Sequence, residues 1–357
     1  MNGRVLIAGF STRHVAQSAY RAGYKVCAVD HFCDQDLTWY TEDRIRFEEL
    51  EDLPDAVTEM SGRHRFDMLV VTSGAEDMPS RIPVCGTSPE TVRNYLDKLE
   101  IQHFFEDLHI PVPALAGEQE YPVFLKPCRG AGGWRNAIVH DDTEKVAWES
   151  LYPGVPYIRQ RVVTGRPASV CCVTDGCHAR AVAANEQILR GTPGAEFGFA
   201  GSITPCSHPA AGSMISMAER IAAASGCKGT IGIDFILEKD VVAVELNPRF
   251  QATVETVEMA TGCNLFRLHA DACRGILPPE QPVATGYAAR KILFADRDMT
   301  VSADLHRLSP MIADIPWPGT ELTKDQAITS VFGQGATRDE ALAILDNNIT
   351  TIRQYLR

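Results

Sequence analysis

The stretch from Asp234 to Phe250, DFILEKDVVAVELNPRF, reads as two short strands joined by a turn. Both halves are rich in Val, Ile and Phe, which favour strands. Lys239 and Asp240 lie between them and predict a two-residue hairpin turn. The ribbon is apolar, yet its strands also carry two carboxylates and a carboxamide, so the hairpin predicts a polar site on an otherwise buried element.

A turn at residues 239 and 240 fixes the register of this hairpin. Asp234 then lies opposite Glu245, with Cβ atoms roughly 5 Å apart. The same register pairs the apolar residues Phe235 with Val244 and Leu237 with Val242. Asn247 is two residues beyond Glu245, so its side chain points to the same face. Two facing carboxylates repel unless a cation lies between them. Oxygen ligands suit Mg²⁺ or Mn²⁺ better than zinc, so we expect a divalent-metal site; the alternative is a solvent-facing strand with scattered charges.

Composition narrows the class of protein. The chain has 357 residues, of which 45% are hydrophobic and 22% charged, as in ordinary soluble proteins of two or three lobes. A net charge of -12 argues against nucleic acid as a partner, although a local phosphate site needs no basic protein. No run approaches the length of a membrane span. The 11 scattered cysteines contain no CxxC pair, so we expect reduced thiols in a cytoplasmic protein, without disulfides or a zinc site.

The first 88 residues alternate between strand and helix patterns. RVLIAGF, KVCAVD and FDMLVVTSG predict buried strands, and TRHVAQSAYRA predicts a helix that ends at Gly23. Such alternation indicates a parallel sheet with ligands at the carboxyl ends of its strands. These ends carry the candidate substrate residues Ser11, Thr12, Arg13, Thr72, Ser73 and Glu76. Residues 11–13 could hold an anionic group at a helix N-terminus, or simply cap that helix.

Two other interpretations of this region are weaker. A dinucleotide site would need G-x-G-x-x-G after the first strand, and only Gly9 is present, so an oxidoreductase is disfavoured. The segment DHFCDQD, residues 30–36, mixes metal-binding residue types, but its tight spacing favours a polar loop at a strand end.

The middle of the chain predicts one long helix, residues 88–108, with Ser88 as N-cap and Pro89 at its first position. Strand patterns dominate from Tyr121 onward. The Gly-rich stretch from Asn185 to Pro205 predicts a long loop, and such loops often cover active sites. Gln187 and Arg190 within it are candidate substrate residues; a mobile surface loop is the alternative.

A glycine loop follows the strand that ends in Lys126. In FLKPCRGAGGWRNAIV, the residues Gly130, Gly132 and Gly133 let backbone N–H groups approach an anion. Lys126 adds a positive charge beside them. This is not a Walker loop, because GxxxxGK[ST] is absent and a strand follows. Alone, the pattern also fits an ordinary glycine hairpin beside a lysine.

The order of these motifs is more specific than any one of them. LDK, with Lys98, is followed by the Lys-Pro glycine loop, the segment QRVV, the Asp234 strand and ELNPR. In this order the chain resembles the ATP-grasp superfamily. It is most similar to the carboxylate–amine ligases related to biotin carboxylase, which include archaeal predicted ATP-dependent carboligases and tyramine–glutamate ligase. The resemblance implies an α/β fold: a Rossmann-like domain over residues 1–88, a small α+β lid domain over 89–163, and an α+β domain over 164–357 with a mostly antiparallel sheet.

The resemblance also implies roles for individual residues. Lys98 and Lys126 would hold ATP phosphates under the glycine loop, and Arg249 would stabilise the transferring phosphoryl group. Two Mg²⁺ or Mn²⁺ ions would bind Asp234, Glu245 and Asn247. The backbone of Gln160, Arg161, Val162 and Val163 would line the adenine. This linker lacks the acidic residues that the family often uses for adenine and ribose, so the ribose partner is not identified.

The implied activity is an ATP- and Mg²⁺-dependent ligase. A small-molecule carboxylate would become an acyl phosphate with release of ADP, and an amine would displace the phosphate to form an amide. The chain could act as a homodimer, as related enzymes often do. A biotin-carboxylase-like enzyme that uses bicarbonate and a non-catalytic ATP-binding module remain alternatives.

Overall fold

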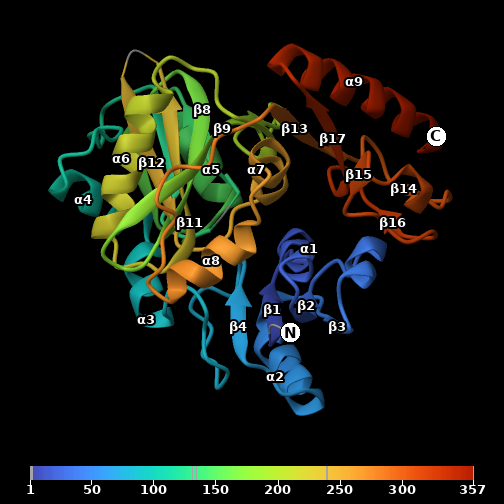
Figure 1. Cartoon of the computed structure of the whole chain (residues 1–357). Coiled ribbons are helices and arrows are strands. Elements are labelled where there is room, and N and C mark those ends of the chain that lie inside the picture. The colour runs from blue at the N-terminus through green and yellow to red at the C-terminus, as the bar shows by residue number, and fades with distance from the viewer. Residues whose placement is uncertain (1–2, 131, 134, 239, 357) are drawn as a thin grey trace.

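Sheets with helices packed on their faces make up the chain (Figure 1). The computed structural model describes residues 3–356, apart from residues 131, 134 and 239. Within these residues there are a four-stranded, a three-stranded and an eight-stranded sheet and a two-stranded ribbon. No helix in this described part is long and apolar enough to cross a membrane.

The N-terminal sheet is parallel, as the alternating patterns predict. Its strands lie in the order β3-β2-β1-β4, and their apolar runs are buried between α1 on one face and α2 on the other. The elements are β1 (Arg4–Gly9), α1 (Arg13–Arg21), β2 (Lys25–Asp30), η1 (Gln35–Trp39), β3 (Asp43–Arg46), η2 (Leu50–Asp52), α2 (Leu53–Arg63) and β4 (Met68–Val71).

The long helix expected after residue 88 is wrong, because the chain breaks before Lys98. Ser88 does cap the first turn by accepting from Thr91 N–H, but Asp97 is extended and its side chain caps a new helix at Leu99 N–H. The elements here are α3 (Pro89–Val92), η3 (Arg93–Tyr95), α4 (Lys98–Asp107), β5 (Val123–Pro127), β6 (Ala137–Val139), α5 (Asp142–Leu151) and β7 (Tyr157–Arg161). Strands β6, β5 and β7 form the three-stranded antiparallel sheet, and the break places Lys98 beside it.

The large sheet is antiparallel throughout, with the order β12-β11-β8-β9-β10-β13-β17-β15. Helix α6 packs on one face, α7 and α8 on the other, and α9 on β13 and β17. The elements are β8 (Arg166–Thr174), β9 (Ala179–Leu189), β10 (Phe199–Thr204), α6 (Ala211–Ala224), β11 (Gly229–Leu237), β12 (Val241–Asn247), α7 (Val254–Thr261), α8 (Leu265–Cys273), β13 (Tyr287–Phe294), β14 (Met299–Thr300), η4 (His306–Leu308), β15 (Ile312–Ala313), β16 (Glu321–Leu322), β17 (Ala327–Gly335) and α9 (Arg338–Tyr355).

The Gly-rich stretch from Asn185 to Pro205 is a hairpin, and the long loop expected there is wrong. Residues 185–189 belong to β9 and Phe199–Thr204 forms β10, with Phe199 paired to Leu189. Only residues 190–198 connect the strands. The β-branched and aromatic residues on either side of the glycines favour strands, and they form the paired part of the hairpin.

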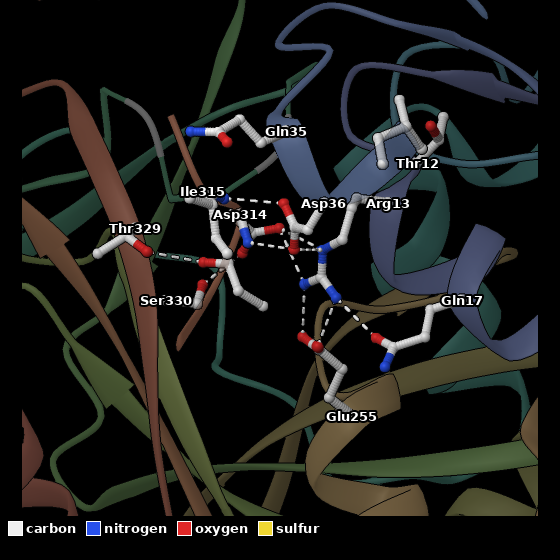
Figure 2. Close-up of polar contacts among 12 residues, drawn as sticks. Thr12, Arg13, Gln17, Gln35, Asp36, Glu255, Asp314, Ile315, Thr329 and Ser330 are labelled. Carbon is white, nitrogen blue, oxygen red and sulfur yellow. Dashed lines mark hydrogen bonds and ion pairs between the residues drawn. The ribbon is translucent and has the colours of Figure 1, made fainter. Parts of the chain in front are cut away.

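A buried ion cluster connects the N-terminal sheet to the C-terminal part of the chain (Figure 2). Arg13 of α1 is only 2% exposed and binds both oxygens of Glu255 on α7, at 2.6 and 2.9 Å. Its Nε donates to Asp314 Oδ1 at 2.9 Å and lies 3.3 Å from Asp36 Oδ2. Arg290 of β13 donates to Asp314 from the other side, at 3.0 Å. Segments far apart in sequence therefore share one charge network.

From the sequence, Arg13 could hold an anionic substrate group, and these contacts do not fit that role. Its guanidinium is occupied by protein carboxylates rather than open to a small anion. Burial alone would raise the pKa of Asp314, but the positive charges of Arg13 and Arg290 outweigh it and hold that pKa well below its ordinary value. The cluster is thus ionised and mutually dependent.

We predict that Arg13→Ala lowers the free energy of unfolding by about 3–5 kcal/mol, because buried Asp36 loses its ion pair and Glu255 and Asp314 keep only Arg290. Urea unfolding at pH 7 measures this change. Arg21→Ala is the control: Arg21 is on the same helix but 57% exposed and 3.7 Å from Glu258, so its loss should cost less than about 1 kcal/mol. Equal unfolding midpoints for the two variants would contradict the assignment.

Candidate active site

The hairpin of β11 and β12 has the expected register at its polar end only. Asp234 pairs with Glu245, as predicted, but Phe235 pairs with Ala243 and Leu237 with Val241, so the predicted apolar pairs are wrong. A β-bulge at Val244 causes the shift, because one extra residue on β12 faces a single position of β11. The connection is therefore residues 238–240; the turn expected at Lys239 and Asp240 lies partly outside the described residues, since Lys239 is not described.

The bulge has a direct consequence for a predicted site residue. The Val244 carbonyl accepts a hydrogen bond from Lys126 Nζ at 2.7 Å. Lys126 lies on β5 of the three-stranded sheet, so the bulge connects that sheet to the hairpin. A regular ladder would use the same carbonyl for strand pairing.

Carboxamides surround Asp234. Its Oδ2 accepts from Asn247 Nδ2 at 3.0 Å, and its Oδ1 accepts from Gln187 at 2.8 Å and Gln251 at 3.1 Å. Gln251 was not predicted, although a polar residue directly after ELNPR and a phenylalanine was a signal in the sequence. Gly232 makes room for it, because a Cβ there would lie 1.7 Å from Gln251 Cδ. Asp234, Asn247 and Gln187 therefore come together as expected.

Two buried lysines face Glu245. Lys126 Nζ lies 3.5 Å from Glu245 Oε2, and Lys98 Nζ lies 3.8 Å from Oε1. Lys98 also donates to the Gly130 carbonyl at 2.5 Å, so it touches the glycine loop and the hairpin at once. Both lysines thus meet at Glu245, and a small pocket beside it is lined by Lys98, Pro127, Arg129, Gly130, Gly133, Asn136 and Glu245.

The two paired carboxyl groups differ in protonation. Burial would raise the pKa of Glu245, but Lys126 and Lys98 outweigh it and lower that pKa, so Glu245 is ionised. Burial and the charge of Glu245 raise the pKa of Asp234 to about 7. Burial lowers the pKa of Lys126. A divalent cation beside Asp234 would relieve its repulsion from Glu245, and oxygen donors of this kind fit Mg²⁺. Gln251 Oε1, buried without a hydrogen-bond partner, adds a further free oxygen.

The glycine loop packs under the tip of the β9–β10 hairpin. A Cβ at Gly133 would lie 2.1 Å from the Phe197 carbonyl oxygen, whereas at Gly130 and Gly132 it would meet open space. All three have positive φ. The Phe124 ring on β5 contacts the Phe197 ring edge to face, with centroids 4.8 Å apart. The hairpin tip, residues 190–198, is therefore a cover over this loop.

Arg249 pairs with Glu76 from the segment after β4. Its Nε donates to Glu76 Oε1 at 2.7 Å, and its other nitrogens donate to Asn247 Oδ1 and the Phe250 carbonyl. The nearby acids of the following helix pair elsewhere: Arg13 binds Glu255, and Glu258 accepts from the Ser18 hydroxyl and Leu265 N–H.

Glu76 brings the N-terminal strand ends toward this centre. Thr72 Oγ1 donates to the Ser11 carbonyl at 3.0 Å, and the Ser73 carbonyl accepts from Phe10 N–H, so these candidates share one cluster of loops. Thr12 instead donates to Asp30 from both its backbone and its hydroxyl. Asp30 also accepts from Phe32 and Cys33 N–H, which fits the polar-loop interpretation of residues 30–36.

Other candidates lie apart from the lysines. Arg190 binds Asp325 at 2.6 Å and stacks over the Phe294 ring. Gln160 is buried and donates to Gln102, while the side chain of Arg161 turns away to Glu120. Val162 and Val163 follow β7 and are partly exposed. Backbone contacts of residues 160–163 remain a prediction.

Comparisons with known proteins agree with this architecture. Residues 95–253 match the ATP-grasp domain. The large chain of carbamoyl phosphate synthase from Thermoanaerobacter pseudethanolicus is 28% identical over 55% of this chain and 20% of its own length. The C-terminal section of that synthase from Methanopyrus kandleri is 26% identical over 76% of this chain and 55% of its own. The chain thus spans a fifth to about half of these relatives.

Solved structures share the fold over nearly the whole chain. The biotin carboxylase domain of 2-oxoglutarate carboxylase from Hydrogenobacter thermophilus, in complex with MgADP, ADP and bicarbonate, has a TM-score of 0.81 at 14% identity and covers 98% of this chain and 89% of that one. The L-amino acid ligase from Bacillus licheniformis has a TM-score of 0.73 at 15% identity, with coverage of 98% and 97%. Residues 95–253 therefore form an ATP-grasp domain, and the expected ATP-grasp fold is confirmed.

We predict that the free energy of unfolding of the metal-free protein depends on pH, because ionising Asp234 in the folded state is unfavourable. Its pKa is raised to about 7 from an ordinary value of 3.8, so the unfolded chain releases this proton first and stability falls as pH rises through this window. Asp234→Asn removes that contribution. Between pH 4.5 and 8, the variant should gain roughly 2–4 kcal/mol relative to the natural protein.

Urea unfolding in EDTA at both pH values measures this difference. Mg²⁺ added at pH 8 should stabilise the natural protein and leave Asp234→Asn almost unchanged. A stability difference that does not vary with pH would contradict the raised pKa.

Gly132 and Gly133 are neighbours that differ in what a methyl group would contact. Gly133→Ala should loosen the hairpin tip, because its methyl group meets the Phe197 carbonyl, and trypsin should then cleave after Arg190 about tenfold faster for a clash of about 1.4 kcal/mol. Gly132→Ala carries a similar backbone strain without the clash and is the matched control. Equal cleavage rates for both variants would show that the tip does not rest on Gly133.

Proposed function

We propose that this chain is an ATP- and Mg²⁺-dependent ligase that activates a small-molecule carboxylate as an acyl phosphate and joins it to an amine. One observation carries the proposal. Two buried lysines, a glycine loop, a registered pair of carboxylates and Arg249 converge from three separate parts of the fold. A protein that merely needed stability would gain little from burying so many charges.

The positive groups are suited to the phosphates of ATP. Lys98 and Lys126 are less than 10% exposed, so phosphate oxygens bound beside them would meet positive charges that water screens little. The glycines at 130, 132 and 133 expose backbone N–H groups in conformations that few other residues adopt. Backbone atoms of residues 160–163 would contact the adenine. The proposal therefore places the triphosphate between the glycine loop and β12.

The acidic groups are suited to divalent cations. Asp234, Glu245 and Asn247 would hold one or two Mg²⁺ or Mn²⁺ ions, which neutralise phosphate charge and orient the γ-phosphate when bound. Asp234 needs such a partner to ionise fully at neutral pH, because burial and Glu245 raise its pKa. MgADP in the complex of the Hydrogenobacter thermophilus domain supports the choice of cofactor.

The chemistry then needs positioning more than a protein nucleophile. A substrate carboxylate oxygen attacks the γ-phosphorus, the bond to ADP breaks, and the acyl phosphate forms. An amine attacks the activated carbonyl, phosphate leaves, and the amine loses a proton. Arg249 lies 2.7 Å from Glu76 and beside Asn247, where a guanidinium can stabilise the charge that develops on the phosphoryl oxygens.

The N-terminal loops would hold the substrates. Glu76 already contacts Arg249, and Thr72, Ser73 and Ser11 lie in the same group of loops; Gln187 reaches Asp234 from β9. We propose that these residues contact the carboxylate or the amine. We also propose a cytoplasmic location and a possible homodimer.

A phosphate-release screen tests the proposal. The protein is incubated with ATP and Mg²⁺ and with pairs of carboxylates and amines, and bicarbonate is included as one acid. The expected products are ADP, phosphate and an amide. Phosphate release that depends on bicarbonate would favour a carboxylase, which the fold of the Hydrogenobacter thermophilus domain also permits. AMP and pyrophosphate as products would overturn the acyl-phosphate mechanism.

We predict that Arg249→Ala lowers kcat by about 10²-fold or more while ATP affinity changes little, because the charge that Arg249 meets builds only during phosphoryl transfer. Steady-state kinetics and thermal melting of the same preparations measure both effects. Glu76→Gln removes the same ion pair but keeps the guanidinium, so its loss of kcat should be smaller. If the ion pair is only structural, both variants melt earlier and turn over normally per folded molecule.

A further inference from the structure

Two thiols and an imidazole meet outside the proposed active site. Cys85 lies in the segment after β4, and its N–H donates to the carbonyl of Leu69 on β4 at 2.8 Å. His269 and Cys273 are one turn apart on α8. The two sulfurs and a ring nitrogen all lie within 4.8 Å of one another. These residues have no part in the proposed reaction, and nothing in the sequence pattern singled them out.

The hydrogen bonds of His269 decide what this cluster can do. The ring is 2% exposed, and its Nδ1 accepts from Thr230 N–H at 2.8 Å. The neutral ring therefore carries its proton on Nε2, which donates to the Cys85 carbonyl at 2.9 Å and lies 3.9 Å from Cys273 Sγ.

A metal ion does not suit this arrangement. Coordination through Nε2 would need the lone pair on that atom, and the proton would move to Nδ1, where it would face the Thr230 N–H. The ring has little freedom to turn, because a Cβ at Gly229 would lie 2.5 Å from Nδ1 and Phe250 packs on it with centroids 4.6 Å apart. His269 is thus held with its Nε2–H on the Cys85 carbonyl and beside the Cys273 sulfur.

The two thiols are unequal. A hydrogen bond from Cys273 and the nearby His269 lower the pKa of Cys85 to about 5, whereas the bond to Cys85 and burial raise that of Cys273. Wherever another cysteine in the described part of the chain has a shifted pKa, burial raises it. Both cysteines of the pair are only partly buried residues.

We propose that Cys85 and Cys273 form a redox-active thiol pair that closes to an intramolecular disulfide. With a low-molecular-weight disulfide RSSR as oxidant, the Cys85 thiolate attacks one sulfur, forms a mixed disulfide and releases RS⁻. Cys273 then gives its proton to solvent base and attacks Cys85 Sγ, releasing the second RS⁻. The protein loses two electrons, and RSSR is reduced to two thiols.

The bond would connect two parts of the fold that the proposed reaction uses together. It would join the segment after β4, which leads from Glu76, to α8, which packs against β11, the strand of Asp234. The sulfur atoms must approach to about 2 Å, so a side-chain rotation of one or both cysteines is required. The proposal is independent of the proposed ligase activity, because its readouts are masses and thiol reactivity.

Oxidised glutathione is the probe. We expect the natural protein to lose the mass of two hydrogens without keeping glutathione, and peptide mapping to link Cys85 to Cys273. Cys273→Ser should instead retain one glutathione on Cys85, because the second attack is missing. Cys85→Ser should form neither the link nor a rapid adduct. Cys177→Ser is the control, since Cys177 is exposed and outside the cluster, and it should still form the link.

The pH dependence of alkylation is a second readout that does not need the disulfide to form. Iodoacetamide should modify Cys85 at pH 6 about as fast as at pH 8, because the thiolate is already formed, whereas a free thiol of ordinary pKa such as N-acetylcysteine reacts about 10²-fold more slowly at the lower pH. A stable glutathione adduct on Cys85 of the natural protein would overturn the proposal. So would one equivalent of Zn²⁺ that binds both thiols and blocks oxidation.

Discussion

The registered pair of Asp234 and Glu245 is the constraint on which the rest of the site depends. Side chains opposite one another on neighbouring strands cannot separate without breaking the ladder, so the two carboxyl groups are held together by backbone hydrogen bonds. The bulge at Val244, one residue before Glu245, then frees a carbonyl for Lys126. Through this irregularity, the three-stranded sheet gains a hydrogen bond to the large sheet at the point where charge is concentrated.

The charges themselves are poorly arranged for stability without a ligand. Glu245 faces two buried lysines, but Asp234 is buried beside the charge of Glu245, and burial and that charge raise its pKa to about 7. Natural proteins retain such features where function requires them, because a ligand that binds only the folded state returns the lost stability. The proposed Mg²⁺ ions and ATP phosphates would supply the missing partners.

The Arg13 cluster acts at a distance from this centre (Figure 2). It joins α1, α7 and the segment after β15, and so fixes the N-terminal sheet against the C-terminal part of the large sheet. The Glu76–Arg249 ion pair is a second contact between the N-terminal part and the large sheet, so both clusters constrain how the two parts lie.

The sequence by itself determined the parallel N-terminal sheet through strand and helix alternation, and the ATP-grasp fold through the resemblance carried by the order of its motifs. The predicted pairing of Asp234 with Glu245 is also correct, because the bulge at Val244 offsets the longer connection between the strands. The helix break at Asp97, the hairpin over Asn185–Pro205 and the bulge at Val244 were not predicted from the sequence. Gly, Asp and apolar residues at these positions permit more than one local structure. Only the tertiary structure decided that Glu76 partners Arg249, that Arg13 is saturated by carboxylates and that Cys85 meets Cys273. These contacts join residues far apart in the chain, and no local pattern encodes a distance that packing of separate elements sets.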